Sequence, residues 1–244
     1  MVIYLAGLGF FIFCEYTWPR WKLPQVSFWY VRLFIFIAIG AAIVSQPQIV
    51  VRLFPPGYSL LNLAQKTNVL FMTVIGYLSV SLVKYWWHRL RHASAFLWRH
   101  LHQIHHSATR VETLTALYKH PLENVIFVFI HVIVFWPVLG LSYQAIANCI
   151  LLFNLGEAFQ HANIKTPRWL GYFLSTPGVH RVHHEYGKHT GNFSDLVLWD
   201  MIFGTYVNPH QMEGPFGFDA AKENQVLPML LFRDVDGLNL KTKN

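Results

Sequence analysis

The stretch NVLFMTVIGYLSVSLVKYWWHRLRH, residues 68–92, decides the fold of this chain. Residues 68–87 are long and apolar enough to cross a bilayer as one helix, which needs roughly 17–25 such residues. Trp86 and Trp87 stand where an interfacial aromatic belt is expected. His88 and His92 continue the helix, and side chains four residues apart share a helix face, so both imidazoles can reach one ion. The stretch predicts a membrane span with a metal-binding end.

The composition agrees with a membrane protein. The chain has 244 residues, of which 54% are hydrophobic and 13% are charged, whereas soluble domains carry about 25% charged residues. These values exclude a disordered chain, a coiled coil and an ordinary water-soluble enzyme. The 14 histidines outnumber the 12 acidic residues, which points toward a metal. Cys14 and Cys149 lie inside apolar runs and cannot supply a disulfide framework or a thiolate zinc site.

Other apolar segments extend the prediction to the whole chain. Residues 28–44, 124–140 and 143–160 have spanning length, and the last two form a predicted helical hairpin. Residues 2–17 are short, so this segment can span the bilayer or lie at its interface. We therefore predict an all-α membrane protein that forms a single domain over residues 1–244. It has four or five apolar helices and a cytoplasmic helical cap carrying a histidine-rich di-metal site.

The distribution of charge predicts the orientation. Residues 88–123 and 161–244 must share one side of the membrane, because the hairpin between them leaves and returns. With Lys84 near the end of the preceding span, and Arg20 and Lys22 of the first loop, that side holds 16 of the 19 lysines and arginines. By the positive-inside rule this side is cytoplasmic. Orientation explains the basic excess, so nucleic acid is not an expected partner.

Two further histidine clusters follow the first, and both read H-x-x-H-H. In each, the first and last rings are one helical turn apart, while the middle ring is offset toward a neighbouring site. A lone histidine is more often structural, but three clusters at ligand spacing favour a metal centre with two ions. The clustered residues are His88, His92, His102, His105, His106, His180, His183 and His184.

Imidazole ligands suit zinc, copper, iron and nickel. A membrane zinc protease would need H-E-x-x-H, and residues 184–189 miss that spacing by one residue. A b-type haem would need a pair of axial histidines within the bundle, where only His131 is centrally placed in a span. Soluble di-iron bundles use Glu and Glu-x-x-His ligands, and few acids lie near these histidines. A histidine-rich membrane di-iron site remains.

The sequence resembles the sterol desaturase/fatty acid hydroxylase superfamily of membrane di-iron enzymes, with the best match over residues 85–206. The matching strings are YWWHRLRH (85–92), LWRHLHQIHHS (97–107), KHPLE (119–123), FQHANIKTP (159–167), TPGVHRVHHE (176–185) and NFSDLVLWDMIFGTY (192–206). The resemblance implies that the eight clustered histidines bind iron and that His161 is a ninth ligand.

Four other positions are candidate ligands or supporting residues by the same resemblance. His120 and His189 match family histidines, and Glu157 stands where some members carry another histidine. Asp200 can orient a ligand imidazole or cap a helix. No catalytic residue beyond the metal ligands is predicted.

The resemblance implies an O₂-dependent di-iron oxidoreductase with two non-haem iron ions. It would hydroxylate or desaturate a C–H bond of a lipid from the bilayer, such as a sterol or a fatty acyl chain. Electrons would come from a separate donor of the cytochrome b5 or ferredoxin type with its reductase, and this sequence contains no G-x-G-x-x-G nucleotide motif. Two alternatives stay open: a family member that oxidises without hydroxylating, and a non-enzymatic histidine-rich metal transporter or sensor.

Overall fold

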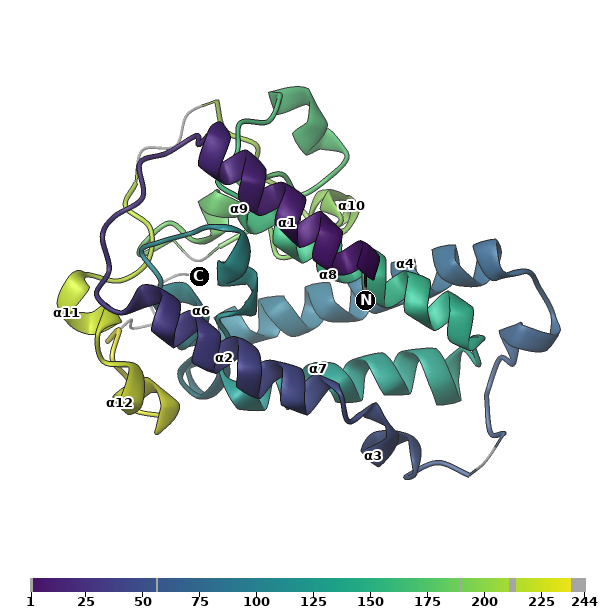
Figure 1. Cartoon of the computed structure of the whole chain (residues 1–244). Helices are drawn as coiled ribbons and strands as arrows, with labels where there is room; N and C mark the ends of the chain where they lie inside the picture. The colour runs from purple at the N-terminus through teal and green to yellow at the C-terminus, as the bar shows by residue number, and fades with distance from the viewer. Residues whose placement is uncertain (1, 56, 189, 211–213, 238–244) are drawn as a thin grey trace.

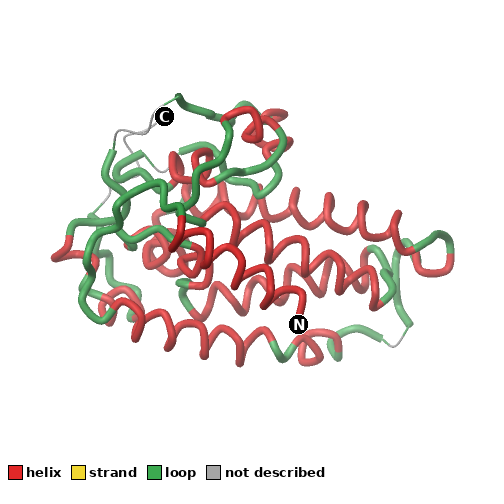
Figure 2. The backbone as a smooth tube through the Cα atoms, turned by 45° about the horizontal axis from the view of Figure 1, so that its top comes forward, coloured by secondary structure: helices red, strands yellow, loops and turns green. Residues whose placement is uncertain are grey.

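A computed structural model describes residues 2–55, 57–188, 190–210 and 214–237, and the elements in these ranges are all helical (Figures 1 and 2). Five long helices run side by side. They are α1 (Val2–Thr17), α2 (Trp29–Val44), α4 (Val69–Ala93), α7 (Pro121–Ile133) and α8 (Tyr143–His161). The predicted all-α fold is confirmed.

Shorter helical elements complete the chain. On the far side of the bundle are α3 (Pro47–Val51), η1 (Leu63–Gln65) and η4 (Val134–Val138), which continues α7 as a π-helical turn. The others belong to the cap, which comprises the described residues of 94–120 and 162–237. They are α5 (Ala95–Leu97), η2 (Trp98–His102), α6 (Gln103–Ser107), η3 (Thr113–Leu117), η5 (Arg168–Tyr172), α9 (Pro177–His183), α10 (Val197–Ile202), α11 (Ala220–Glu223) and α12 (Val226–Leu230).

All five long helices end or begin at the cap. At the end of α1, the Glu15 carboxylate accepts hydrogen bonds from the Thr113 and Asn163 backbone N–H groups. At the start of α2, the Trp29 indole donates to Glu112. The opposite end of the bundle is joined separately, since the Leu60 N–H donates to the Pro137 carbonyl. The cap therefore closes one end of the bundle only.

Three described helical stretches are long and apolar enough to cross a membrane: Trp29–Val51, Val69–Ala93 and Pro121–Val138. Helix α1 is apolar but shorter. The predicted span 143–160 corresponds to α8, which has the length but contains Asn148, Asn154 and Glu157 and lies outside that set. The chain is an integral membrane protein whose α8 packs mainly against α4.

The close packing of α4 on α8 depends on Gly76. A Cβ atom added there would lie 2.7 Å from Leu141 and 2.8 Å from the Cys149 sulfur, closer than side chains tolerate. Asn68 caps the start of α4, its side chain accepting from the Phe71 N–H, and Ser142 caps α8 in the same way. These local signals align the two helices whose last turns carry histidines.

Candidate metal centre

Nine buried histidines converge in the cap end of the bundle, in two neighbouring groups. In each group the possible ligand atoms all lie within 4.8 Å of one another. Group A comprises His88, His92, His102, His106 and His183, and group B comprises His105, His161, His180 and His184. The groups touch, because the His106 and His184 rings stack with centroids 4.4 Å apart.

Each H-x-x-H-H segment contributes to both groups. His102 and His106 face group A while His105, between them, faces group B. In the second segment the assignment is reversed, with His180 and His184 in group B and His183 in group A. A π-helical turn at η2 leads into the first segment, and α9 carries the second. Helical spacing therefore divides each segment between two sites.

Most ligand rings are oriented through the nitrogen that faces away from the group. The Nδ1–H groups of His88, His161 and His183 donate to the backbone carbonyls of Phe193, Glu157 and Gly191, over 2.7–2.9 Å. His105 donates in the same way to Tyr118. An Nδ1–H that donates to a carbonyl fixes the tautomer whose Nε2 lone pair is free for a metal.

The Nε2 atoms face one another at short range. In group A, His88 Nε2 lies 2.9 Å from His102 Nε2, and in group B His161 Nε2 lies 3.1 Å from His180 Nε2. Two lone pairs at this distance repel unless a cation lies between them. Metal–nitrogen bonds of about 2.0–2.1 Å place two ligands of one ion about 3 Å apart. The donor set therefore fits an ion in each group.

Burial keeps the rings of the cap neutral, as metal binding requires. Desolvation lowers the pKa of each of these imidazoles well below its usual value, and neighbouring charged or imidazole groups lower it further. The residues are His102, His105, His106, His180 and His184.

Glu123 and Arg91 support His102 from behind, a role that the sequence pattern did not predict for either residue. The Glu123 carboxylate, fully buried, forms an ion pair with Arg91 and lies 3.3 Å from His102 Nδ1. Arg91 Nη1 also lies 2.8 Å from the same nitrogen. Arginine only donates, so a metal at Nε2 requires Nδ1–H to donate to Glu123. A glutamate in the first turn of an otherwise apolar helix was the available sequence signal.

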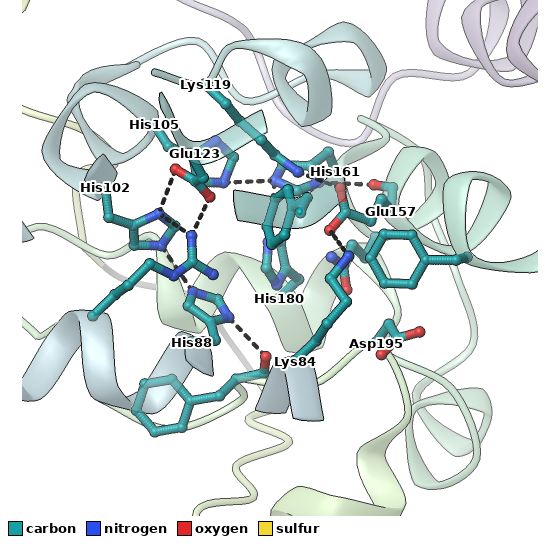
Figure 3. Close-up of a pocket in the computed structure, with 15 residues that line it drawn as sticks. Lys84, His88, His102, His105, Lys119, Glu123, Glu157, His161, His180 and Asp195 are labelled. Carbon is teal, nitrogen blue, oxygen red and sulfur yellow. Dashed lines mark hydrogen bonds and ion pairs between the residues drawn. The ribbon is translucent and has the colours of Figure 1, made fainter. Parts of the chain in front are cut away.

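A small cavity of about 30 Å³ lies beside both groups (Figure 3). Its wall includes His88 and His102 of group A and His105, His161 and His180 of group B. Glu157 does not join either group; it forms ion pairs with Lys119 and, at 3.7 Å, with Lys84. Phe127 and Phe153 add an apolar wall. The cavity thus brings buried charges and aromatic rings next to the candidate ligands.

The other candidates lie outside the two groups. His120 caps α7, accepting from the Leu122 N–H, and its Nε2–H donates to the Leu230 carbonyl. Asp200 accepts from the backbone N–H groups of Phe193 and Ser194, so it acts on the loop whose carbonyl holds His88 rather than on a ring. His189 lies outside the described residues.

Comparison with known proteins finds one matching family model and several similar proteins. The model of the family described as fatty acid hydroxylase matches residues 73–205, which include all nine histidines. Sphinganine C4-monooxygenase 2 of Arabidopsis thaliana is 28% identical over 144 residues, which are 57% of this chain and 55% of that protein. A very-long-chain aldehyde decarbonylase of Oryza sativa is 25% identical over 183 residues, covering 72% of this chain and 63% of that protein.

Alkylglycerol monooxygenase of Homo sapiens is 32% identical over 135 residues, covering 53% of this chain and 29% of that protein. The chain therefore spans less than two thirds of the length of each of these relatives. No solved structure matches the chain.

Proposed function

This chain belongs to the fatty acid hydroxylase family, and from that premise we propose that it is a membrane-bound di-iron oxygenase that oxidises a C–H bond of a lipid. The single observation that carries the proposal is the pair of buried histidine groups. Within each group the possible ligand atoms all lie within 4.8 Å of one another. A hydroxylated lipid is the expected product, and desaturation is the second outcome of the same chemistry.

The nine histidines of groups A and B are the proposed ligands, with no catalytic residue beyond them. Two ferrous ions, when bound, supply the activation of O₂ that protein side chains lack. The chain's own residues hold the rings through Nδ1, keep them neutral by burial, and exclude bulk water. His120 and Asp200 are assigned supporting roles at α7 and at the Phe193 loop.

A lipid substrate is supported by the location of the cavity and by the relatives. The cavity adjoins the cap ends of α4, α7 and α8, so an acyl chain can approach from the bilayer. The names of two relatives include sphinganine and alkylglycerol. How the carbon is held relative to the ions decides between hydroxylation and desaturation.

The metal centre is proposed to face the cytoplasm, since the segments predicted on its side of the membrane hold 16 of the 19 lysines and arginines. Electrons then come from a separate carrier, of the cytochrome b5 or ferredoxin type with its reductase. The excess of cations on this side of the membrane favours an acidic partner electrostatically.

The test is the purified protein in lipid nanodiscs, supplied with iron, a chemical reductant and ¹⁸O₂. About two irons per chain and ¹⁸O in a lipid hydroxyl group are expected. His183→Ala removes a ligand of group A and should abolish incorporation. His210→Ala is the matched control, because His210 lies in neither group, and it should leave incorporation intact.

Three results would count against the proposal. Zinc as the sole bound metal would refute iron chemistry, and equal effects of the two substitutions would refute the ligand assignment. In a parallel reconstitution into sealed lipid vesicles, metal flux across the membrane without lipid oxidation would favour a transporter. The nine histidines of groups A and B cluster together rather than forming a path across the bundle, which argues against transport.

A further inference from the structure

A segment of the cap packs against the middle of a membrane-spanning helix. Residues 193–205, which include α10, lie beside α4 (Figure 1). The Tyr77 hydroxyl donates to Asp195 over 2.8 Å, and the Trp199 indole donates to Ser81 over 2.7 Å. Both partners on α4 precede its histidines by at least seven residues. The segment therefore turns back from the metal centre toward the span.

The position along α4 gives the depth of these contacts. A helix rises 1.5 Å per residue, so Tyr77 and Tyr85 lie about 12 Å and about 24 Å from the start of α4. The hydrocarbon core is about 30 Å thick. Tyr85 contacts Thr205 at 3.0 Å, so the whole segment is level with the part of α4 that crosses this core.

The outer face of α10 is apolar and exposed in the isolated chain. Leu198 is 44% exposed and Ile202 58%, and Met201 lies on the same surface. This face continues directly onto α4, because the rings of Phe203 and Trp86 lie 4.8 Å apart and both are exposed. The lipid-facing surface of α4 and the surface of α10 are thus one apolar patch, defined here as the α10 patch.

The polar groups of the segment are satisfied within the protein. Asp200 accepts from Phe193 N–H, Ser194 N–H and the Thr205 hydroxyl. Ser194 Oγ accepts from the Leu196 N–H. No lysine or arginine occurs in residues 189–221, although the rest of the cap is basic. Non-helical backbone at membrane depth persists only where its polar groups are paired in this way.

We propose that α10 and its flanking residues are a re-entrant element, inserted into the acyl chains of the leaflet on the metal-centre side. The occupant of the α10 patch is bilayer lipid. Continuity with the exposed face of a spanning helix argues for lipid, and so does the absence of cations from the segment. The proposal depends on α4 crossing the membrane and does not depend on the chemistry of the metal centre.

The experiment places one nitroxide label at Ile202→Cys, in a background in which Cys14 and Cys149 are replaced by serine and alanine. The protein is reconstituted in phosphatidylcholine vesicles, and collisions of the label with O₂ and with a water-soluble nickel chelate are compared by EPR. Val74→Cys on the exposed face of α4 is the lipid reference. Lys188→Cys, at an exposed position that forms an ion pair with Glu185, is the water reference.

The expected ratio of O₂ to nickel collisions at residue 202 equals that of residue 74 and is several-fold above that of residue 188. A ratio equal to that of residue 188 overturns the proposal. Low collision rates with both reagents also overturn it, because a protein surface then covers the patch. Leu198→Cys reports on the same face if the variant at residue 202 does not fold.

Discussion

At the residue scale, the second ring nitrogen orients five of the nine candidate ligands, namely His88, His102, His105, His161 and His183. His88 and His183 donate to carbonyls of residues 193 and 191, in loops distant in sequence from α4 and next to α9. These bonds hold the rings before any ion arrives. The free energy of ordering the ligands is thus contributed by folding rather than by metal binding.

Glu123→Gln should weaken iron binding by about 10- to 100-fold, since the residue orients His102 and its loss also leaves Arg91 without a buried counter-charge. The affinity is measured by competition with a chelator. Asp219→Asn is the control, because that carboxylate is exposed and its ion pair with Lys222 is distant at 3.9 Å. Equal affinities of the two variants would contradict the role of Glu123.

Glu157→Gln should lower the free energy of unfolding by about 3–5 kcal/mol, because it leaves Lys84 and Lys119 facing each other in a buried site. Adding Lys84→Met removes one of the two cations and should recover part of the loss. Thermal unfolding in detergent measures both changes. Additive losses in the double variant would show that the lysines are not coupled through Glu157.

At the element scale, most of the candidate ligands lie on short helices, whose caps matter more than their length. Helix α9 has seven residues, starts at Pro177 and is capped by Thr176, whose side chain accepts from the Val179 N–H. It carries His180 and His183, one for each group. A helix of two turns has little stability of its own, so its cap and its packing determine how firmly these rings are placed.

Thr176→Ala should cost about 1 kcal/mol of stability and also reduce iron affinity, because the first turn of α9 loosens. Asn68→Ala removes an equivalent cap from α4 at the end away from the histidines. It should cost similar stability and leave iron affinity unchanged. Thermal melts and chelator competition on both variants separate the two effects.

The features of the fold and of the metal centre that could be predicted from the sequence are those that depend on the spacing of nearby residues. The apolar run 68–87 and the H-x-x-H-H spacing identified α4 and the division of each segment between two groups, because both follow from helical geometry. Contacts between distant segments could not be predicted in this way. Glu123 reaches His102 from α7, and Phe193 reaches His88 across 105 residues. The hydrophobic pattern also predicted residues 143–160 as a span. The corresponding helix α8 contains Asn148, Asn154 and Glu157 and is not among the three candidate spans.

At the scale of the whole molecule, a bundle of apolar helices supports a dry, histidine-rich cap. Clustering so many imidazoles is possible only while they are neutral. Their pKa values are lowered by burial, so the unfolded chain binds protons at a higher pH than the folded chain does. Stability is then present above the unfolded pKa, near 6.5, and is lost as the pH falls below it.

Acidifying the metal-free protein from pH 7.5 to 5.5 should therefore lower its stability by up to about 1.4 kcal/mol for each such histidine. Thermal unfolding in detergent at several pH values measures the loss. Iron-loaded protein should resist the change, because the ions occupy the nitrogens that protons would take. A metal-free protein whose melting temperature stays constant over this range would contradict the buried, neutral state of the rings.

The exchange of ligands between the two H-x-x-H-H segments has a consequence for how the centre fills. His105 sits between two ligands of group A, and His183 between two ligands of group B. An ion bound in either group orders the H-x-x-H-H segments that also position the ligands of the other group. Molecules with only one ion should therefore be scarce. Native mass spectrometry during titration with ferrous iron should show two main species, empty and doubly loaded, with the singly loaded chain never dominant.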